Sequence, residues 1–381
     1  MFRYKYPELV FRILLFKNPN EINSIFPLGL SFIIFHCISY IVDLYKLDKQ
    51  EKYLSKTNMI NYMSYILFFP KLIQGPIVRY TDMKNQLVYR DISYENFYYA
   101  LNRFIIGFCK KTIVADTLGG FARNIFSLNK LDTPTAWMGV LIFTMQIYVD
   151  FSAYSDMAIA LARFFGFKIP ENFQYPYVSK SISEFWNRWH ISLGNWFKNY
   201  VYFPLGGNRR GNVYLNILVV FLLTGIWHGN TSIYLLWGLI HGLFVMLEKT
   251  KVYKKISQKK GFSVFGWIYT MFVVSIGWLC FILPDTNALY DYIKVLFGIT
   301  HYSDIQLGWQ LFYTPRILFY VILGIAISVI PASDKYKTFV SKLKKKESYV
   351  LISNIVLLFL FSLGYVFMIS NGYSPFIYFK Y

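Results

Sequence analysis

The sequence is poor in charged residues, and this shortage limits what the protein can be. Only 15% of its 381 residues are charged, while 55% are hydrophobic. A soluble domain carries about 25% charged residues. Aromatic residues reach 21%, an abundance typical of proteins whose rings gather at membrane–water interfaces. The composition therefore predicts a polytopic, all-α integral membrane protein and argues against a soluble domain.

Cysteines and several catalytic motifs are also scarce or missing. The three cysteines, Cys37, Cys109 and Cys280, form no CxxC pair, so neither a disulfide framework nor a zinc knuckle is predicted. There is no HExxH or GxSxG motif. Gly206 and Gly211 have P-loop spacing, but no Gly-Lys-Ser/Thr follows. We expect no bound metal, no bound cofactor and no nucleotide-driven transport.

Long apolar runs provide the expected membrane segments. A bilayer is spanned by roughly 20 apolar residues, and on this basis we expect about eight to ten segments. The uncharged runs Val264–Pro284 and Val350–Ser370 give the clearest signal. Further candidates are Phe26–Leu44, Pro134–Phe151, Val213–Trp227, Ser232–Leu247 and Tyr313–Ile330. The stretch Asn58–Tyr80 contains Pro70, Gly75 and Pro76, and we expect it to be re-entrant or kinked.

Positive charge exceeds negative charge, with 39 Lys and Arg against 20 Asp and Glu. This balance can indicate a nucleic-acid-binding protein. Here, however, the basic residues cluster between hydrophobic runs, where the positive-inside rule places them. The main clusters are Lys46–Lys56, Lys249–Lys260 and Lys335–Lys346. We therefore expect membrane lipid and no nucleic acid as a partner, with these clusters on the cytoplasmic side.

Histidine near the end of an apolar run is the first candidate for chemistry, because intramembrane polar residues are functional candidates by default. His228 follows Trp227 in LLTGIWHGN, where a partly desolvated imidazole stays neutral and can accept a proton. The alternative is a helix-terminal histidine that bonds a carbonyl. His241, in LWGLIHGLF, either supports this site or packs against another helix.

A second histidine, His190, ends the segment EFWNRWH. If the segment is one helix, Trp186, Trp189 and His190 share a face, and Glu184 lies one turn before Arg188. The alternative is an interfacial amphipathic helix whose aromatic rings lie at the headgroup level. The following segment, YFPLGGNRRG, favours a functional site over an interfacial helix, since its paired glycines and arginines can turn closely around an anionic group.

Two carboxylates lie inside a mainly apolar run. Asp150 and Asp156 belong to QIYVDFSAYSDMAIALARFFGF, and buried carboxylates need partners. Arg163 and Arg188 are plausible ones. The carboxylates either line a polar tunnel or form a structural ion-pair network, and the sequence leaves both readings open.

These segments together resemble the membrane-bound O-acyltransferases, in the branch of bacterial alginate O-acetyltransferases. The resemblance is carried by PLGLSFIIFHCISYIVDLY, FFPKLIQGPIVRYTDM, the run from QIYVDFSAYSDM to PLGGNRRG, and GIWHGNTSIYLLWGLIHGL. It implies one integral-membrane domain over residues 1–381, a helical bundle with re-entrant segments around a central tunnel. Family members have further helices before the PLG motif, so we also expect this chain to be a shortened or N-terminally incomplete member.

The resemblance also implies an activity and its site. An acyl group, with acetyl expected first, would pass from a cytoplasmic thioester such as acetyl-CoA to a hydroxyl for an extracytoplasmic polysaccharide. His228, in the Trp-His-Gly motif, would be the general base, and His190 would stabilise the oxyanion. The expected tunnel-lining residues are Asp150, Asp156, Glu184, Trp186, Arg188 and Trp227, and those expected to bind the donor are Gly206, Gly207 and Arg209. The expected location is the bacterial inner membrane, with an extracytoplasmic acetyltransferase as a candidate relay partner.

Two other functions remain open. Within the family, the alternative is D-alanyl transfer toward teichoic acid with a small acyl-carrier protein as donor. Outside it, the alternative is a transporter that uses its buried acids and histidines as a proton relay, although no inverted repeat supports this. One departure from the family pattern is Lys198-Asn199, where members often have Arg-Asp. It removes a local ion pair and is expected to alter donor or partner contacts.

Overall fold

The computed structural model describes residues 29–48, 59–302, 308–372 and 374–376. Every regular element in these ranges is a helix, and none of them is a strand, so the predicted all-α class is confirmed. Five of the described helical segments are long and apolar enough to cross a membrane: Thr133–Phe164, Ser232–Lys249, Phe262–Phe281, Pro315–Ala332 and Ser348–Asn371. The predicted multi-pass membrane protein is therefore confirmed.

Each apolar run named from the sequence forms a helix. The corresponding elements are α3 (Leu30–Asp48), α8 (Thr133–Phe164), α11 (Val213–His228), α12 (Ser232–Lys249), α14 (Phe262–Trp278), α16 (Pro315–Val329) and α18 (Ser348–Asn371). The stretch expected to be kinked is broken into α4 (Met59–Ile66) and the short η2 (Phe69–Lys71), followed by extended chain up to α5 (Tyr80–Val88). Most of the Lys46–Lys56 cluster lies outside the described residues.

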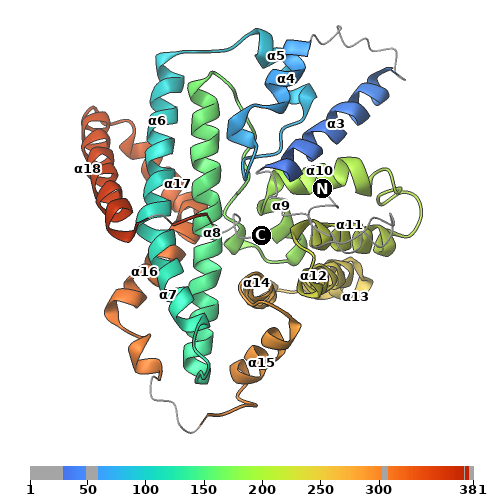
Figure 1. The fold of residues 1–381 in the computed structure, drawn as a ribbon, viewed down its shortest axis with the longest axis vertical. Coiled ribbons are helices and arrows are strands. Elements are labelled where there is room, and N and C mark those ends of the chain that lie inside the picture. Colours follow the sequence, from blue (N-terminus) through green and yellow to red (C-terminus); the bar gives the residue numbers. More distant parts are fainter. Residues whose placement is uncertain (1–28, 49–58, 303–307, 373, 377–381) are drawn as a thin grey trace, which may run out of the picture.

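The long rod beside α8 was not predicted. It consists of α6 (Tyr94–Cys109), the π-helical turn η3 (Lys110–Ala115) and α7 (Asp116–Phe126), and it runs along α8 (Figure 1). Charged residues interrupt its hydrophobic pattern, but they are paired inside the protein. Lys110 bonds Asp156 at 2.9 Å, and Lys111 bonds Asp150 at 2.8 Å and Asp116 at 2.7 Å.

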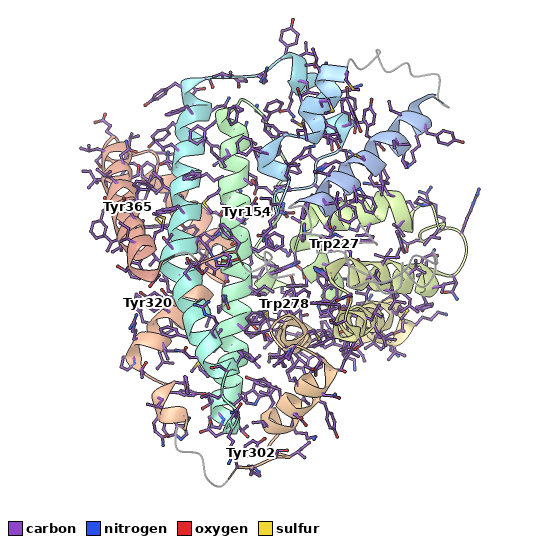
Figure 2. The ribbon with its side chains drawn as sticks, in the orientation of Figure 1. Tyr154, Trp227, Trp278, Tyr302, Tyr320 and Tyr365 are labelled. Atoms are coloured by element: carbon purple, nitrogen blue, oxygen red, sulfur yellow. The ribbon has the colours of Figure 1, made fainter. Side chains whose placement is uncertain are left out.

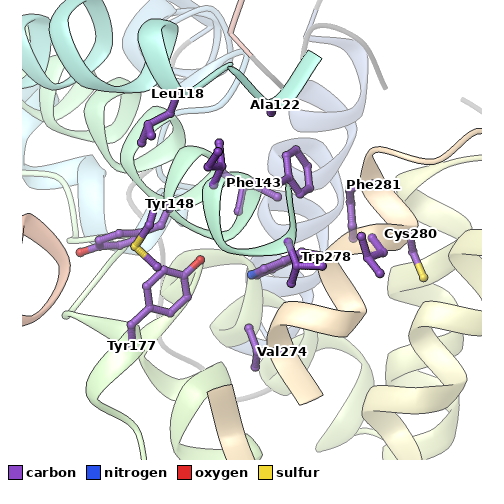
Figure 3. Packing of buried hydrophobic residues seen from close by; sticks show 14 of the residues in the cluster. Leu118, Ala122, Phe143, Tyr148, Tyr177, Val274, Trp278, Cys280 and Phe281 are labelled. Carbon is purple, nitrogen blue, oxygen red and sulfur yellow. The ribbon is translucent and has the colours of Figure 1, made fainter. Parts of the chain in front are cut away.

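Helix α8 is the centre of the bundle. The most apolar 18-residue stretch of α8 is 83% buried, whereas that of α18 is only 6% buried. Helix α18 lies at the edge of the molecule (Figure 1). The main core packs around α8 with contributions from α7, α14 and the segment that holds Tyr177 (Figure 3). Trp189, Trp237 and Trp278 are among the largest fully buried side chains. The aromatic core thus lies between α8 and the helices that carry the candidate site.

Short helices gather with α11 and α12 on the side of α8 opposite to α18 (Figure 1). They are η4 (Pro176–Val178), α9 (Ile182–Arg188), α10 (Ile191–Phe197), the π-helical η5 (Lys198–Tyr202) and α13 (Lys251–Ser257). The remaining elements are η6 (Leu279–Phe281), α15 (Thr286–Leu296), η7 (Trp309–Leu311), η8 (Ile330–Ala332) and α17 (Asp334–Leu343). Trp227 and Trp278 both lie on the side of α8 where α9 and α10 gather with α11 and α12 (Figure 2).

Candidate active site

The segment that contains His190 is two helices and not one. α9 ends at Arg188, and His190 adopts a left-handed conformation with φ 43° before α10 begins at Ile191. A non-glycine residue in this region is uncommon and strained, and such residues cluster at functional sites. The condition under which Trp186, Trp189 and His190 would share one helical face is therefore not met, because the chain leaves the helix before the histidine.

Backbone hydrogen bonds hold this break in place. The amide of Ile191 donates to the carbonyl of Asn172 at 3.0 Å, and the amide of Gln174 donates to the carbonyl of Arg188 at 3.0 Å. Because bonds form on both sides of Trp189 and His190, the left-handed turn is fixed by tertiary structure. Residues 172–174 therefore position the histidine, although the sequence gives no local signal for this.

The imidazole of His190 is bonded on one nitrogen only. Its Nδ1 lies 3.1 Å from Oδ1 of Asn172, whereas its buried Nε2 has no hydrogen-bond partner in the described part of the chain. The residue is 3% exposed, and burial lowers its pKa to about 3. His190 is therefore neutral and keeps one ring nitrogen available for a ligand.

His190 borders a cavity of about 420 Å³ between the short helices and α11–α12. The segment that contains EFWNRWH and YFPLGGNRRG contributes Ser183, Trp186, Asn187, Trp189, His190, Leu193, Gly194, Phe197, Lys198, Tyr202, Phe203 and Asn208 to its lining. α11 and α12 add Thr224, Trp237 and Lys249, among others. The stretch that combines tryptophans with charged residues therefore forms most of one wall.

Two lysines contribute charge to this cavity. Lys198 begins η5 and Lys249 ends α12, and both line the space. Burial, and then the neighbouring Lys249 ammonium, lower the pKa of Lys198, whose Nζ donates to Oδ1 of Asn187 at 2.7 Å. In the sequence, Lys198 stands out only as a departure from the family pattern and Lys249 only as part of a basic cluster. Their shared location was found only in three dimensions.

Helix α12 fixes the tryptophan wall of the cavity. The carboxylate of Glu248 accepts hydrogen bonds from the backbone amides of Ile182 and Ser183 at the start of α9. One turn along α9, the indole N–H of Trp186 donates to Nδ1 of the fully buried His241 at 3.3 Å. His241 thus supports the site through Trp186, which was one of the two roles considered for it.

His228 lies close to this cavity but does not line it. Its ring centroid is 5.1 Å from that of Trp237 and 4.9 Å from that of Phe281. Trp237 does line the cavity, so its ring contacts both the cavity and His228. Trp227 packs against both histidines, with centroids 4.6 Å from His228 and 6.4 Å from His190.

The predicted polar lining residues are distributed differently from the expectation. Glu184 and Arg188 form the expected i, i+4 pair at 2.9 Å, but they do not line this cavity, and neither do Trp227, Asp150 and Asp156. Arg163 and Arg188 are not the partners of the two aspartates. Asp150 bonds Lys111, and Asp156 bonds Arg103 and Lys110 at 2.9 Å each. The structure thus places both carboxylates in an ion-pair network on the α6–α8 side.

The glycine turn lies beside the cavity and not on it. Gly206 and Gly207 both have positive φ, and a Cβ at Gly206 would meet the carbonyl oxygen of Arg210 at 2.3 Å. Asn208 lines the cavity, whereas Gly206, Gly207 and the exposed Arg209 do not. The turn therefore shapes the rim of the cavity, and the cations that line the space are Lys198 and Lys249.

Comparisons with known proteins identify the family of this chain. The model of the MBOAT, membrane-bound O-acyltransferase family, matches residues 28–291. This chain belongs to the membrane-bound O-acyltransferase family. Its enzymatic class is therefore O-acyl transfer, as the resemblance implied.

Individual relatives narrow the branch. The chain is 34% identical to the probable alginate O-acetylase AlgI of Pseudomonas putida over 93% of this chain and 75% of that protein. It is 30% identical to the peptidoglycan O-acetyltransferase of Helicobacter pylori over 97% of this chain and 77% of that protein. The chain is 29% identical to the teichoic acid D-alanyltransferase of Bacillus subtilis, over 68% of this chain and 69% of that protein. The chain spans about half the length of the alginate O-acetylases of other pseudomonads that it matches.

Proposed function

We propose that this O-acyltransferase moves an acetyl group from a thioester donor to a hydroxyl of an extracytoplasmic polysaccharide, and that it works in the bacterial cytoplasmic membrane. The alginate and peptidoglycan O-acetyltransferase relatives support both the acetyl group and the polysaccharide class. The observation that carries the proposal is the cavity that joins two lysines to a neutral, buried histidine with one unbonded ring nitrogen.

The donor is proposed to enter on the side of Lys198 and Lys249. Both lysines line the cavity, and its remaining lining is largely apolar. A thioester such as acetyl-CoA combines anionic phosphates with a slim uncharged arm, so the lysines would bind the phosphates while the arm extends toward His190. Lys249 begins the basic cluster expected to face the cytoplasm, which supports entry from that side.

The chemistry requires a base for the acceptor hydroxyl and donors for the oxyanion. As the hydroxyl oxygen attacks the thioester carbonyl, a C–O bond forms, the C–S bond breaks and one proton passes from the alcohol to the leaving thiol. A positioned imidazole contributes about 10²–10⁴-fold to such a transfer. The prediction from the resemblance gave the base role to His228, which does not line the cavity. We propose that His190 takes the hydroxyl proton at the cavity, while His228 orients the acceptor hydroxyl from its own side.

Transfer of D-alanine is the second candidate, because a teichoic acid D-alanyltransferase is among the relatives. The two activities use the same type of site but different donors, a free acyl-CoA or the thioester of a small carrier protein. For acetyl transfer, we also propose an extracytoplasmic acetyltransferase as a partner that relays the acetyl group to the polysaccharide. Even a small carrier protein is too large for a cavity of about 420 Å³ and would dock outside it, so donor preference distinguishes the two.

The test uses the full chain purified into lipid nanodiscs and radiolabelled acetyl-CoA. We expect release of free thiol and transfer of label to soluble alginate or peptidoglycan fragments, or to a relay protein added with them. Loss of both in His190→Ala supports the proposal. Turnover only with D-alanyl carrier protein would support the second candidate, and thiol release that does not depend on His190 would contradict the proposed site.

A further inference from the structure

We infer that Asn172 is a positioning residue that keeps the proton of neutral His190 on Nδ1 and leaves Nε2 as the proton acceptor at the cavity. The catalytic part of this inference rests on the proposed function, whereas the tautomer itself does not. The inference replaces the oxyanion-stabilising role expected for His190, because a nitrogen without a hydrogen cannot donate to an oxyanion.

The hydrogen bonds around Asn172 determine which way its side chain points. The backbone amide of Ser192 can only donate, and it lies 3.3 Å from Oδ1 of Asn172. The opposite end of the amide, Nδ2, donates to Oγ of Ser155 on α8 at 3.3 Å. Exchanging the oxygen and nitrogen would bring two N–H groups together at Ser192, so Oδ1 is the atom that faces His190.

The hydrogen bonds of the Ser192 hydroxyl independently indicate the same orientation of the Asn172 amide. Its Oγ accepts the backbone N–H of Ile77 at 2.9 Å. Its own hydrogen is then free to be donated to Oδ1 of Asn172 at 2.7 Å. Ile77 belongs to the extended chain between η2 and α5, so the broken segment 59–80 takes part in orienting the amide.

An oxygen that accepts these bonds can bond Nδ1 of His190 only if that nitrogen carries the hydrogen. Neutral imidazole has one N–H, so Nε2 then holds a lone pair. The neighbouring rings are Phe151 of α8, perpendicular at 4.9 Å, and Trp227 of α11 at 6.4 Å. Neither is titratable, and burial is the cause of the low pKa of His190. The ring is therefore held neutral by its surroundings and oriented by Asn172.

Catalysis follows from this orientation. Nε2 takes the hydroxyl proton as the new C–O bond forms, and it returns the proton to the thiolate when the C–S bond breaks. The ring is neutral again after each turnover, with its Nδ1 proton unmoved. Asn172 contributes no proton and touches no substrate, so it acts on the rate only through His190.

The first test reads the tautomer without using activity. Full-length protein with ¹⁵N-histidine is examined by NMR in nanodiscs, and the His190 signals are identified by their loss in His190→Gln. We expect a protonated Nδ1 and an unprotonated Nε2. A proton on Nε2 would overturn the inference even if acyl transfer is confirmed, and the expected tautomer would stand even if the proposed donor is wrong.

The second test uses two substitutions at position 172. Asn172→Leu removes the acceptor at similar volume and should lower kcat/KM by about 10- to 100-fold, a part of what a general base contributes. Asn172→Asp keeps the acceptor but adds a negative charge, which favours the imidazolium and raises the pKa of His190. Activity would then fall as the pH drops through this raised pKa, in a range where the wild type is still active.

A matched control separates this effect from simple damage to the fold. Asn216 is another buried asparagine, 5% exposed, whose amide donates to the carbonyl of Gly207 at 3.0 Å away from His190. Asn216→Asp should leave the acidic limb of the pH profile where it is in the wild type. If Asn172→Asp also leaves that limb unmoved and Asn172→Leu retains the wild-type rate, Asn172 has no positioning role.

Discussion

Trp186 and His241 form a perpendicular pair in which the indole N–H bonds Nδ1 of the imidazole at 3.3 Å. Their ring centroids are 5.0 Å apart at 89°. Trp186 lines the cavity, whereas His241 is fully buried against α14. A Cβ at Gly277 would lie 2.6 Å from Nε2 of His241. The wall of the cavity is therefore connected through one histidine to a helix that does not touch the cavity.

Gly277→Ala tests this connection. The added methyl group should push the imidazole of His241 and displace Trp186, with a loss of about 1–3 kcal/mol of stability, as is typical of overpacking, and a reduced acyl-transfer rate. Thermal unfolding and initial rates of the purified protein measure both. Gly120→Ala is the control, because the nearest atom to its Cβ would be 4.0 Å away. Equal activity and stability of the two variants would contradict the connection.

Much of the fold could be predicted from the sequence, and the exceptions have a shared cause. Apolar runs such as Val264–Pro284 identify helices because lipid requires a continuous hydrophobic surface. The rod from Tyr94 to Phe126 was missed because Arg103, Lys110 and Lys111 interrupt such a run. Their charges are neutralised by carboxylates on α8 and elsewhere, and this pairing depends on tertiary contacts that periodicity does not record.

The candidate site was predicted only in part, because it also depends on tertiary contacts. His190 and Trp186 were found because a segment that combines a histidine and charged residues with tryptophans is unusual in a mainly apolar chain. The break at His190 was missed, since it depends on bonds to Asn172, which precedes it by 18 positions. Lys249 was counted in a surface cluster, and only the packing of α11 against both α12 and η5 places it on the cavity with Lys198.

Removing one cation from the buried network should destabilise the fold. Lys111 has a side chain 8% exposed and bonds both Asp116 and Asp150, so Lys111→Met leaves two carboxylates without its charge. Breaking a buried ion pair in this way costs about 3–5 kcal/mol, visible as a lower unfolding temperature in detergent. Lys337→Met, at an exposed pair with Asp334, should leave the unfolding temperature unchanged. Similar behaviour of both variants would argue against a structural role for the network.

Donor binding should depend on the two cavity lysines. Lys198→Ala and Lys249→Ala should each raise the KM for acetyl-CoA by about tenfold or more, the loss of a charge-assisted bond, with a smaller change in kcat. Lys254→Ala, on α13 outside the cavity, is the control. An unchanged donor KM in both cavity variants would show that the phosphates bind elsewhere, for example at Arg209.

The same binding should respond to pH. Burial and Lys249 lower the pKa of Lys198, so its charge is lost at a lower pH than for an ordinary lysine. We therefore expect the donor KM of the wild type to rise toward alkaline pH. Lys198→Arg keeps its charge over this range and should remove that rise. A rise of the same size in the arginine variant would assign the titration to another group.

His228 should be needed for transfer to the acceptor and not for assembly in the membrane. His228→Ala removes a buried imidazole behind Trp237 and is expected to abolish acyl transfer while membrane insertion and yield stay normal. Labelled acetyl transfer to the polysaccharide measures this, and His301→Ala, on an exposed position after α15, is the control. Full transfer activity of purified His228→Ala would remove this residue from the mechanism.

The central claim is that His190, in the cavity shared with Lys198 and Lys249, accepts the proton during thioester cleavage. The most direct measurement is single-turnover thiol release from labelled acetyl-CoA by wild type and His190→Ala in nanodiscs, in the presence of the acceptor. We predict a rate at least about 10²-fold lower in the variant, with donor affinity nearly unchanged. A variant that cleaves the thioester at the wild-type rate would contradict the claim.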